Sequence, residues 1–240
     1  MIRKILGNLA PNMLKGQIRL FKQNRYFLRK SEELNERVCS LDVDYRAYLE
    51  LQLRRTLNKR NRKLPVRGEY LIKKTADNVD IRNLQIVCIG CRNVEELMHF
   101  KKLGAGSVVG VDLYTEHPCI HVMDMHSLTF DDSSFDVVYA SHTLEHALDP
   151  EKVISEFLRV VKTGGVIVIE VPVNYPLNPG GADLVDYESL DRLHSHFGDN
   201  IDNVLWSEFS PSKQIDSGLG TDVVRTILKI KKSAHNLAFC

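Results

Sequence analysis

The sequence predicts an α/β fold, in which a doubly wound, mostly parallel sheet follows a basic helical extension. The chain is 240 residues long and 43% hydrophobic, which suffices for one sizeable core. From residue 84 onward, short apolar runs alternate with segments whose apolar residues recur at helical spacing. Residues 1–82 hold 20 Lys and Arg against 9 Asp and Glu, whereas residues 83–240 hold 12 against 22. This charge difference predicts two parts with different partners: an extension, residues 1–82, and a ligand-binding domain, residues 83–240.

The extension is predicted to be helical. Its first 30 residues contain eight basic and no acidic side chains. Residues 44–62 place apolar side chains on one helical face and end in a run of cations, and Pro65 and Gly68 mark the expected end of this helix. Two interpretations of the cations stay open. They complement the helix dipole on a solvated surface, or they bind a polyanion.

The elements of the second part follow in order along the chain. Strands are predicted at 84–89, 107–111, 120–123, 135–140, 166–171, 203–207 and 223–230, and helices at 94–103, 153–161 and 183–197. Gly164 and Gly165 are expected to end the second of these helices. The strand–helix–strand unit around them implies a right-handed parallel crossover. Ligands of such sheets bind outside the carboxyl ends of the strands, so the site is expected there.

Three motifs within one segment resemble those of the small class I S-adenosylmethionine-dependent methyltransferases. They are Phe135-Asp136-Val137-Val138, Leu144-Glu145-His146, and Arg159-Val160-Val161-Lys162-Thr163-Gly164-Gly165. The family pattern is F-D-x-V, L-x-H and R-x-L-K-P-G-G, with proline usual at the position of Thr163. The resemblance covers about residues 84–232. It implies a Rossmann-like methyltransferase fold with seven strands, the last antiparallel, and S-adenosylmethionine as cofactor.

The turn after the first strand is the expected cofactor loop. Gly90 lets the backbone turn tightly, and Asn93 is suited to cap the next helix. A backbone nest at Gly90, Cys91 and Arg92 suits the carboxylate of an amino-acid-bearing cofactor. The Arg92 side chain either adds a charge-assisted bond or points to solvent. The family has D/E-x-G-x-G-x-G here; this chain keeps Gly90, whereas Arg92 and Val94 replace the later glycines.

An acidic residue closes the second predicted strand. Asp112 lies about 20 residues after the first turn, where a carboxylate binds ribose hydroxyls in dinucleotide folds. The alternative is that Asp112 caps a helix or a surface turn. By resemblance, the remaining cofactor-binding residues are Leu113, packed on the adenine, Asp124 and Met125 at the adenine edge, and Ser141 and His142 beside the cofactor.

The sequence selects no catalytic residue. The candidate bases are His142, Glu145, His146 and Tyr175, and a base is needed only if the methyl acceptor arrives protonated.

The five cysteines form no paired framework, so reduced thiols are expected, and Cys88-x-x-Cys91 straddles a strand end where a redox pair is not expected. No metal site is predicted, because His117, Cys119 and His121 lack a second closely spaced pair of ligands.

Three functions stay open. The leading hypothesis is methyl transfer from S-adenosylmethionine to an unidentified acceptor, with a small molecule favoured. The first alternative is a non-catalytic binding protein that keeps the fold. The loss of the later glycines from the turn at Gly90 suggests this alternative. The second is RNA or anionic-membrane binding through residues 1–82. No apolar run reaches the ~18 residues of a membrane span, so a cytoplasmic location is expected, and the acid-free residues 1–30 leave a mitochondrial address open.

Overall fold

The computed structural model describes residues 45–115, 117–177, 181–212 and 220–232. The helical patterns predicted within residues 1–44 therefore lie outside the described residues. The chain forms two compact units, residues 1–49 and 50–240. Helix α3, Tyr45–Lys59, begins in the first unit and continues into the second. Residues 50–82 of the predicted extension thus belong to the same unit as the sheet, and all that follows concerns this second unit.

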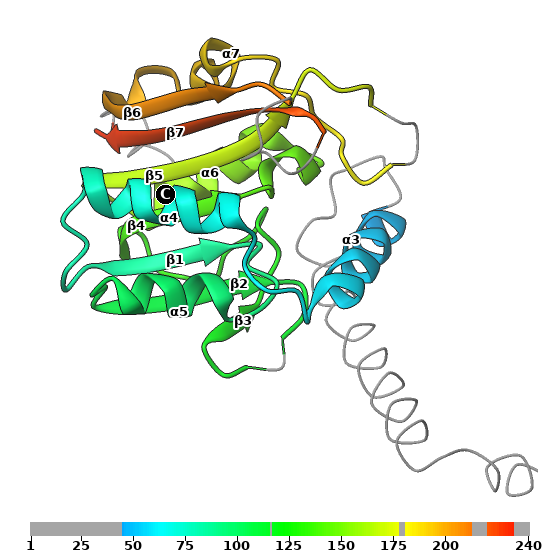
Figure 1. Ribbon diagram of the computed structural model, residues 1–240, viewed down its shortest axis with the longest axis horizontal. Helices are drawn as coiled ribbons and strands as arrows, with labels where there is room; N and C mark the ends of the chain where they lie inside the picture. The colour runs from blue at the N-terminus through cyan, green and yellow to red at the C-terminus, as the bar shows by residue number, and fades with distance from the viewer. Residues whose placement is uncertain (1–44, 116, 178–180, 213–219, 233–240) are drawn as a thin grey trace, which may run out of the picture. The chain divides into compact units, whose positions relative to one another are not determined.

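Seven strands form one sheet in the order β3-β2-β1-β4-β5-β7-β6 (Figure 1). Their bounds are β1 Gln85–Ile89, β2 Ser107–Asp112, β3 Ile120–Val122, β4 Phe135–Ser141, β5 Val161–Val173, β6 Ile201–Ser210 and β7 Asp222–Ile230. The pairs β1–β2, β1–β4, β2–β3 and β4–β5 are parallel, whereas β7 is antiparallel to both of its neighbours. The predicted doubly wound sheet with an antiparallel last strand is confirmed.

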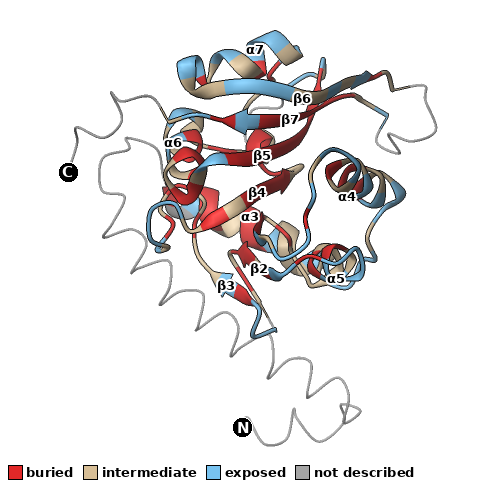
Figure 2. Cartoon of the chain, turned by 90° about the vertical axis from the view of Figure 1, so that its left-hand side faces the viewer, coloured by how far each residue is buried: buried red, intermediate tan, exposed pale blue. Residues whose placement is uncertain are grey.

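Helices cover both faces of this sheet (Figure 2). Helices α4 (Val66–Asn78) and α5 (Glu95–Lys102) lie on one face, and α6 (Pro150–Val160) and α7 (Leu190–Ser195) on the other. Successive residues of β1 point to opposite faces of the sheet. Ile86 packs with the α4–α5 layer, and Val87 packs with the α6–α7 layer. The sheet is therefore buried on both faces, as parallel strands require.

Helix α4 was not predicted. Pro65 and Gly68 were expected to end the preceding helix, but Pro65 is the N-cap of α4, and its carbonyl accepts the amide of Gly68 at 2.8 Å. Proline is well tolerated at a helix start, where its missing N–H costs nothing. Leu71 and Ile72 of α4 are fully buried against the sheet. This helix connects the cationic end of α3 to the core.

Two other boundaries differ from the prediction. Helix α6 ends at Val160, and β5 begins at once, because Val161 already pairs with Phe135. Gly164 and Gly165 therefore lie within β5 and do not end the helix.

The helix predicted at 183–197 is reduced to α7, Leu190–Ser195. The amides of Leu184 and Val185 bind the carbonyl of Glu145, and the carboxylate of Asp186 accepts two further loop amides. Because these groups bond across the loop, a helix cannot begin before residue 190. The segment 183–189 thereby lies beside the candidate site.

Candidate functional site

The predicted cofactor residues follow neighbouring strands at the carboxyl edge of the sheet. The strand order places the ends of β3, β2, β1 and β4 next to one another. In that order they carry Asp124 and Met125, then Asp112 and Leu113, then Gly90, Cys91 and Arg92, and finally Ser141 and His142. The fold therefore places these residues, up to 52 positions apart in the sequence, in one row.

The turn after β1 keeps the backbone shape of a glycine-rich loop although most of its glycines are lost. Gly90 has φ +71°, and a Cβ there would lie 2.3 Å from Oγ1 of Thr143. Arg92 occupies the position of the second family glycine and has φ +59°, a conformation that is uncommon for a residue other than glycine. The neighbouring Asn93 caps α5, because its Oδ1 accepts the amide of Glu95 at 3.0 Å.

The amides of the backbone nest expected at this turn donate hydrogen bonds within the protein, so a ligand would have to replace these bonds. The amides of Gly90 and Cys91 both donate to the carbonyl of Val111, at 2.8 and 3.4 Å, and the amide of Arg92 donates to Oδ2 of Asp112 at 2.7 Å. The Cys91 side chain is buried, and its Sγ contacts the same carbonyl. At this turn, the half-buried guanidinium of Arg92 can still donate hydrogen bonds to the carboxylate of a ligand.

Asp112 faces the Gly90 turn and is almost fully buried. Its carboxylate accepts the amides of Arg92 and Leu113, both at 2.7 Å, and the hydroxyl of Thr56 in α3 at 3.1 Å. Burial raises the pKa of Asp112, although the hydrogen bonds from Arg92 and Thr56 oppose this shift. The surface-turn alternative does not fit such a position. Helix α3 covers this carboxylate, where the ribose was expected.

Asp124, after β3, has one carboxylate oxygen that no group in the described ranges satisfies. Its Oδ1 accepts the amide and Nδ1 of His126, at 2.8 and 2.6 Å. Its Oδ2 is buried and has no hydrogen-bond partner among the residues that the structure describes. A buried unpaired acceptor is costly, so this oxygen is suited to a donor from a ligand, such as the amine of an adenine. Met125, half-buried, is next to it.

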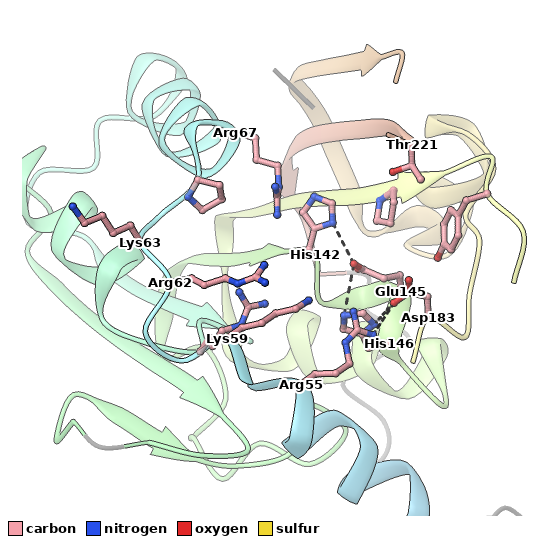
Figure 3. Close-up of a pocket in the computed structure, with 14 residues that line it drawn as sticks. Arg55, Lys59, Arg62, Lys63, Arg67, His142, Glu145, His146, Asp183 and Thr221 are labelled. Carbon is pink, nitrogen blue, oxygen red and sulfur yellow. Dashed lines mark hydrogen bonds and ion pairs between the residues drawn. The ribbon is translucent and has the colours of Figure 1, made fainter. Parts of the chain in front are cut away.

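A cavity of about 340 Å³ lies at the other end of the row (Figure 3). Cations from α3, α4 and the segment between them line one side, and an acidic and histidine-rich group lines the other. The lining residues are Arg55, Lys59, Arg62, Lys63, Pro65, Arg67, Arg92, His142, Glu145, His146, Pro172, Tyr175, Asp183 and Thr221. The cations at the end of α3 and directly after it were predicted either to be solvated or to bind an anion. Four of them line this cavity, namely Arg55, Lys59, Arg62 and Lys63. Of the predicted cofactor residues, Arg92 and His142 line it.

His142 bridges two buried carboxylates. Its Nδ1 lies 3.3 Å from Oε1 of Glu145, and its Nε2 lies 3.0 Å from Oε1 of Glu170 in β5. Burial lowers the pKa of His142, but the two carboxylates outweigh it and raise the pKa to about 9. His142 is therefore protonated at neutral pH and is not a proton acceptor there. The hydroxyl of Ser141 also donates to Glu170, at 3.0 Å, so its predicted cofactor contact has a competing partner.

His146 is the best placed of the four candidate bases. Its Nδ1 lies 3.0 Å from both Oδ1 of Asp183 and the carbonyl of Ala182, and its Nε2 is 3.8 Å from Glu145. Acceptors at Nδ1 favour the tautomer that leaves the lone pair on Nε2. Tyr175 is unsuited, because burial and the nearby carboxylates raise its pKa. Glu145 has a lowered pKa, since His146 and His142 outweigh the effect of burial, and so it is a weak base.

Sequence reasoning missed the buried ion pair behind His142. Glu170 and Arg225 are both fully buried, and Nε of Arg225 lies 2.5 Å from Oε2 of Glu170. They occupy paired positions on β5 and β7. Each is a charged residue within an apolar strand, and this signal could have found them, because a buried charge requires a partner.

The described residues show no group of three His, Cys, Asp or Glu side chains that could hold a metal ion. Cys88 and Cys91 are unbonded to each other, and burial raises the pKa of both thiols, which makes them unreactive. Within the described part of the chain, no helix has the length and hydropathy of a membrane span.

Replacement of Gly90 by alanine is expected to destabilise the protein by about 2 kcal/mol or more. The new Cβ would require the left-handed backbone and would collide with the side chain of Thr143. Urea unfolding measures the change. A second substitution, Thr143→Ala, should recover the part that is due to the collision, and an unchanged midpoint for Gly90→Ala would contradict the geometry.

Comparison with known proteins finds a methyltransferase-domain match. Residues 87–169 match a family model described as a methyltransferase domain. Ajmaline N-methyltransferase from Rauvolfia serpentina is 36% identical over 80 residues, which are 33% of this chain and 27% of that enzyme. The chain thus spans about a quarter of the curated relative that it matches.

Solved structures share the fold at low sequence identity. A Haloferax volcanii methyltransferase in complex with the activator Trm112 has a TM-score of 0.55 and 16% identity, covering 75% of this chain and 95% of that one. A Burkholderia thailandensis 1,6-didemethyltoxoflavin-N1-methyltransferase, solved with S-adenosylhomocysteine, has a TM-score of 0.52 and 13% identity, covering 69% and 77%. The [4+2]-cyclase SpnF has a TM-score of 0.55 and 14% identity, covering 69% and 81%. Residues 87–169 thus match a methyltransferase-domain model, and the strand order is that of the Rossmann-like methyltransferase fold.

Proposed function

We propose that this protein transfers a methyl group from S-adenosylmethionine to an acceptor held in the cavity. One observation carries the proposal: the carboxyl edge of a methyltransferase sheet holds Asp112 and the unsatisfied oxygen of Asp124 in line with a cavity at β1 and β4. In a doubly wound sheet this edge is where nucleotide-like ligands bind.

The residues present fit the cofactor. Asp124 Oδ2 would accept the adenine amine, Asp112 would accept the ribose hydroxyls, and Arg92 would bind the amino-acid carboxylate. For Asp112 to bind ribose, the Thr56 hydroxyl must share or leave the carboxylate. When bound, the cofactor supplies a methyl group on a cationic sulfur.

The chain itself supplies alignment and a proton acceptor. His146 Nε2 would take the proton of the acceptor, and Asp183 would hold the ring in the required tautomer through Nδ1. Protonated His142 would remain between Glu145 and Glu170, where it fixes the loop after β4. With the acceptor aligned toward that methyl group, His146 would hold the proton that the acceptor loses.

Binding of S-adenosylhomocysteine to the full chain tests this proposal by calorimetry. Replacement of Asp112 by alanine should weaken binding about 10- to 100-fold, because unpaired ribose hydroxyls cost about 1–3 kcal/mol. Asp191→Ala, at an exposed position of α7, is the matched control and should bind like the wild type. The absence of binding heat at high protein concentration would argue against the proposal, as would an unchanged affinity of the Asp112 variant.

A non-catalytic binding protein is the second candidate. The internally bonded amides of the Gly90 turn favour it, because they leave a carboxylate fewer donors than a free nest would. The likeness to SpnF, a [4+2]-cyclase, also shows that this fold serves other activities. Incubation of the protein with methyl-labelled cofactor and fractionated cell extract separates the two candidates. Labelling of any fraction above a His146→Gln control would support methyl transfer, whereas cofactor binding without labelling would favour the alternative.

A further inference from the structure

The basic side of the cavity carries more positive charge than the protein neutralises. Arg55 pairs with Asp183 at 2.9 Å. In contrast, Lys59, Arg62 and Lys63 have no carboxylate partner within the described part of the chain, although all three line the cavity. Burial lowers the pKa of Lys59, and Arg55, Arg92 and Arg62 lower it further, although Asp183 opposes them. An anion bound beside Lys59 would offset this repulsion.

Hydrogen bonds hold this basic side in place. The side-chain amide of Asn93 donates to the carbonyls of Arg60 and Arg62, at 2.9 and 2.8 Å. Asn93 also caps α5, so the cationic segment is attached directly to the turn after β1. These bonds fix the backbone of the segment beside the cavity, while the side chains of Arg62 and Lys63 are exposed.

The cofactor of the proposed reaction does not neutralise this charge. S-adenosylmethionine brings one carboxylate, for which Arg92 is available, but it also brings an ammonium and a sulfonium group. Half-buried Lys59 and exposed Arg62 therefore stay available to a ligand with about two negative charges. Figure 3 shows Lys59 and Arg62 on one side of the cavity and Glu145, His146 and Asp183 on the other, so one ligand can contact both sides.

We propose that the methyl acceptor is a small molecule with a phosphate group, which Lys59 and Arg62 bind while its reacting atom faces His146. A phosphate monoester carries a charge of about −1.5 to −2 near pH 7 and three acceptor oxygens, and arginine binds it with two parallel hydrogen bonds. A monocarboxylate would leave one of the two cations unpaired. The volume of about 340 Å³ suits a small molecule. This inference rests on the proposed function.

Calorimetric titration of the full chain with inorganic phosphate, at constant ionic strength, tests the inference with and without saturating S-adenosylhomocysteine. We expect millimolar binding that S-adenosylhomocysteine does not abolish, and no measurable binding of acetate. The double variant Lys59→Gln/Arg62→Gln should weaken phosphate binding at least tenfold and change the affinity for S-adenosylhomocysteine less than threefold. The control Lys73→Gln/Lys102→Gln removes two charges from exposed positions outside the cavity and should change phosphate binding less than twofold.

Several outcomes would overturn the inference. They are absent phosphate binding, equal binding of acetate, equal losses in both double variants, and displacement of phosphate by S-adenosylhomocysteine, which would assign the cations to the cofactor. Failure of the proposed function can be told apart from failure of this inference, because it would be seen as the absence of S-adenosylhomocysteine binding. In that case the titration without S-adenosylhomocysteine still decides whether Lys59 and Arg62 form an anion site.

Discussion

Replacement of Arg225 by methionine is expected to lower the free energy of unfolding by about 3 kcal/mol, because it leaves the carboxylate of Glu170 buried without its closest cation. Both side chains are fully buried. The lower end of the usual range of about 3–5 kcal/mol applies, since His142 stays 3.0 Å from Glu170 and Arg67 stays 3.7 Å from it.

Urea unfolding followed by circular dichroism measures this loss. The double variant Glu170→Gln/Arg225→Met removes both charges and should recover more than half of it, because a buried pair replaced as a whole is nearly neutral. Arg192→Met, at an exposed position of α7, is the matched control and should change stability by less than about 0.5 kcal/mol. If the single variant at 225 behaves like this control, the pair does not stabilise the fold.

The result bears on function because Glu170 joins the core to the candidate site. The carboxylate binds Arg225 on one side, and on the other it contacts His142, which in turn contacts Glu145 beside His146. A chain of alternating charges thus runs from β7 to the cavity. Loss of Arg225 should therefore also alter the position of the loop after β4, although that loop is distant in sequence.

The strands could be predicted because their signal is local. Each of the seven lies in an apolar, β-prone run, and their bounds differ from the prediction by few residues, apart from β5, which begins five residues earlier, and β6, which is longer at both ends. The end positions of the strands then placed Asp112 and Asp124 at one edge. Pattern and topology together therefore sufficed to place the predicted cofactor residues at the same edge of the sheet.

What could not be predicted depends on contacts between distant segments. The amides of the Gly90 turn bond to Val111 and Asp112, and nothing in the turn itself indicates this. Likewise, Thr56 reaches Asp112 across 56 positions, and Asn93 binds the carbonyl of Arg62 across 31. Helix α4 was missed because a proline that starts a helix has the same local sequence signal as one that follows a helix end.

The pH dependence of stability is the second large effect that the structure predicts. The pKa of His142 is raised from 6.5 to about 9, so its contribution to stability is complete below pH 6.5 and is lost as the pH rises through 9. The pKa of Glu170 is lowered from 4.5 to about 2, so its contribution is present above pH 4.5 and is lost as the pH falls through 2. Burial raises the pKa of Glu96 from 4.5 to about 8, so its contribution is complete below pH 4.5 and is lost as the pH rises through 8. The three groups together predict greatest stability near pH 4.5 and a decline above it.

Between pH 6 and 9.5 the free energy of unfolding should fall by roughly 3 kcal/mol through His142 and by a similar amount through Glu96, since each unit of pKa difference is worth about 1.4 kcal/mol. Denaturant unfolding at both pH values measures this fall. His142→Gln should remove about half of it, whereas His117→Gln, at an exposed loop position, should leave it unchanged. The carboxylates that raise the pKa of His142 also keep it protonated. A steep fall would therefore indicate that His142 holds the loop, and His146 would remain the proton acceptor. A fall of equal size in His142→Gln would show that another group titrates, and His142 would again be a candidate base.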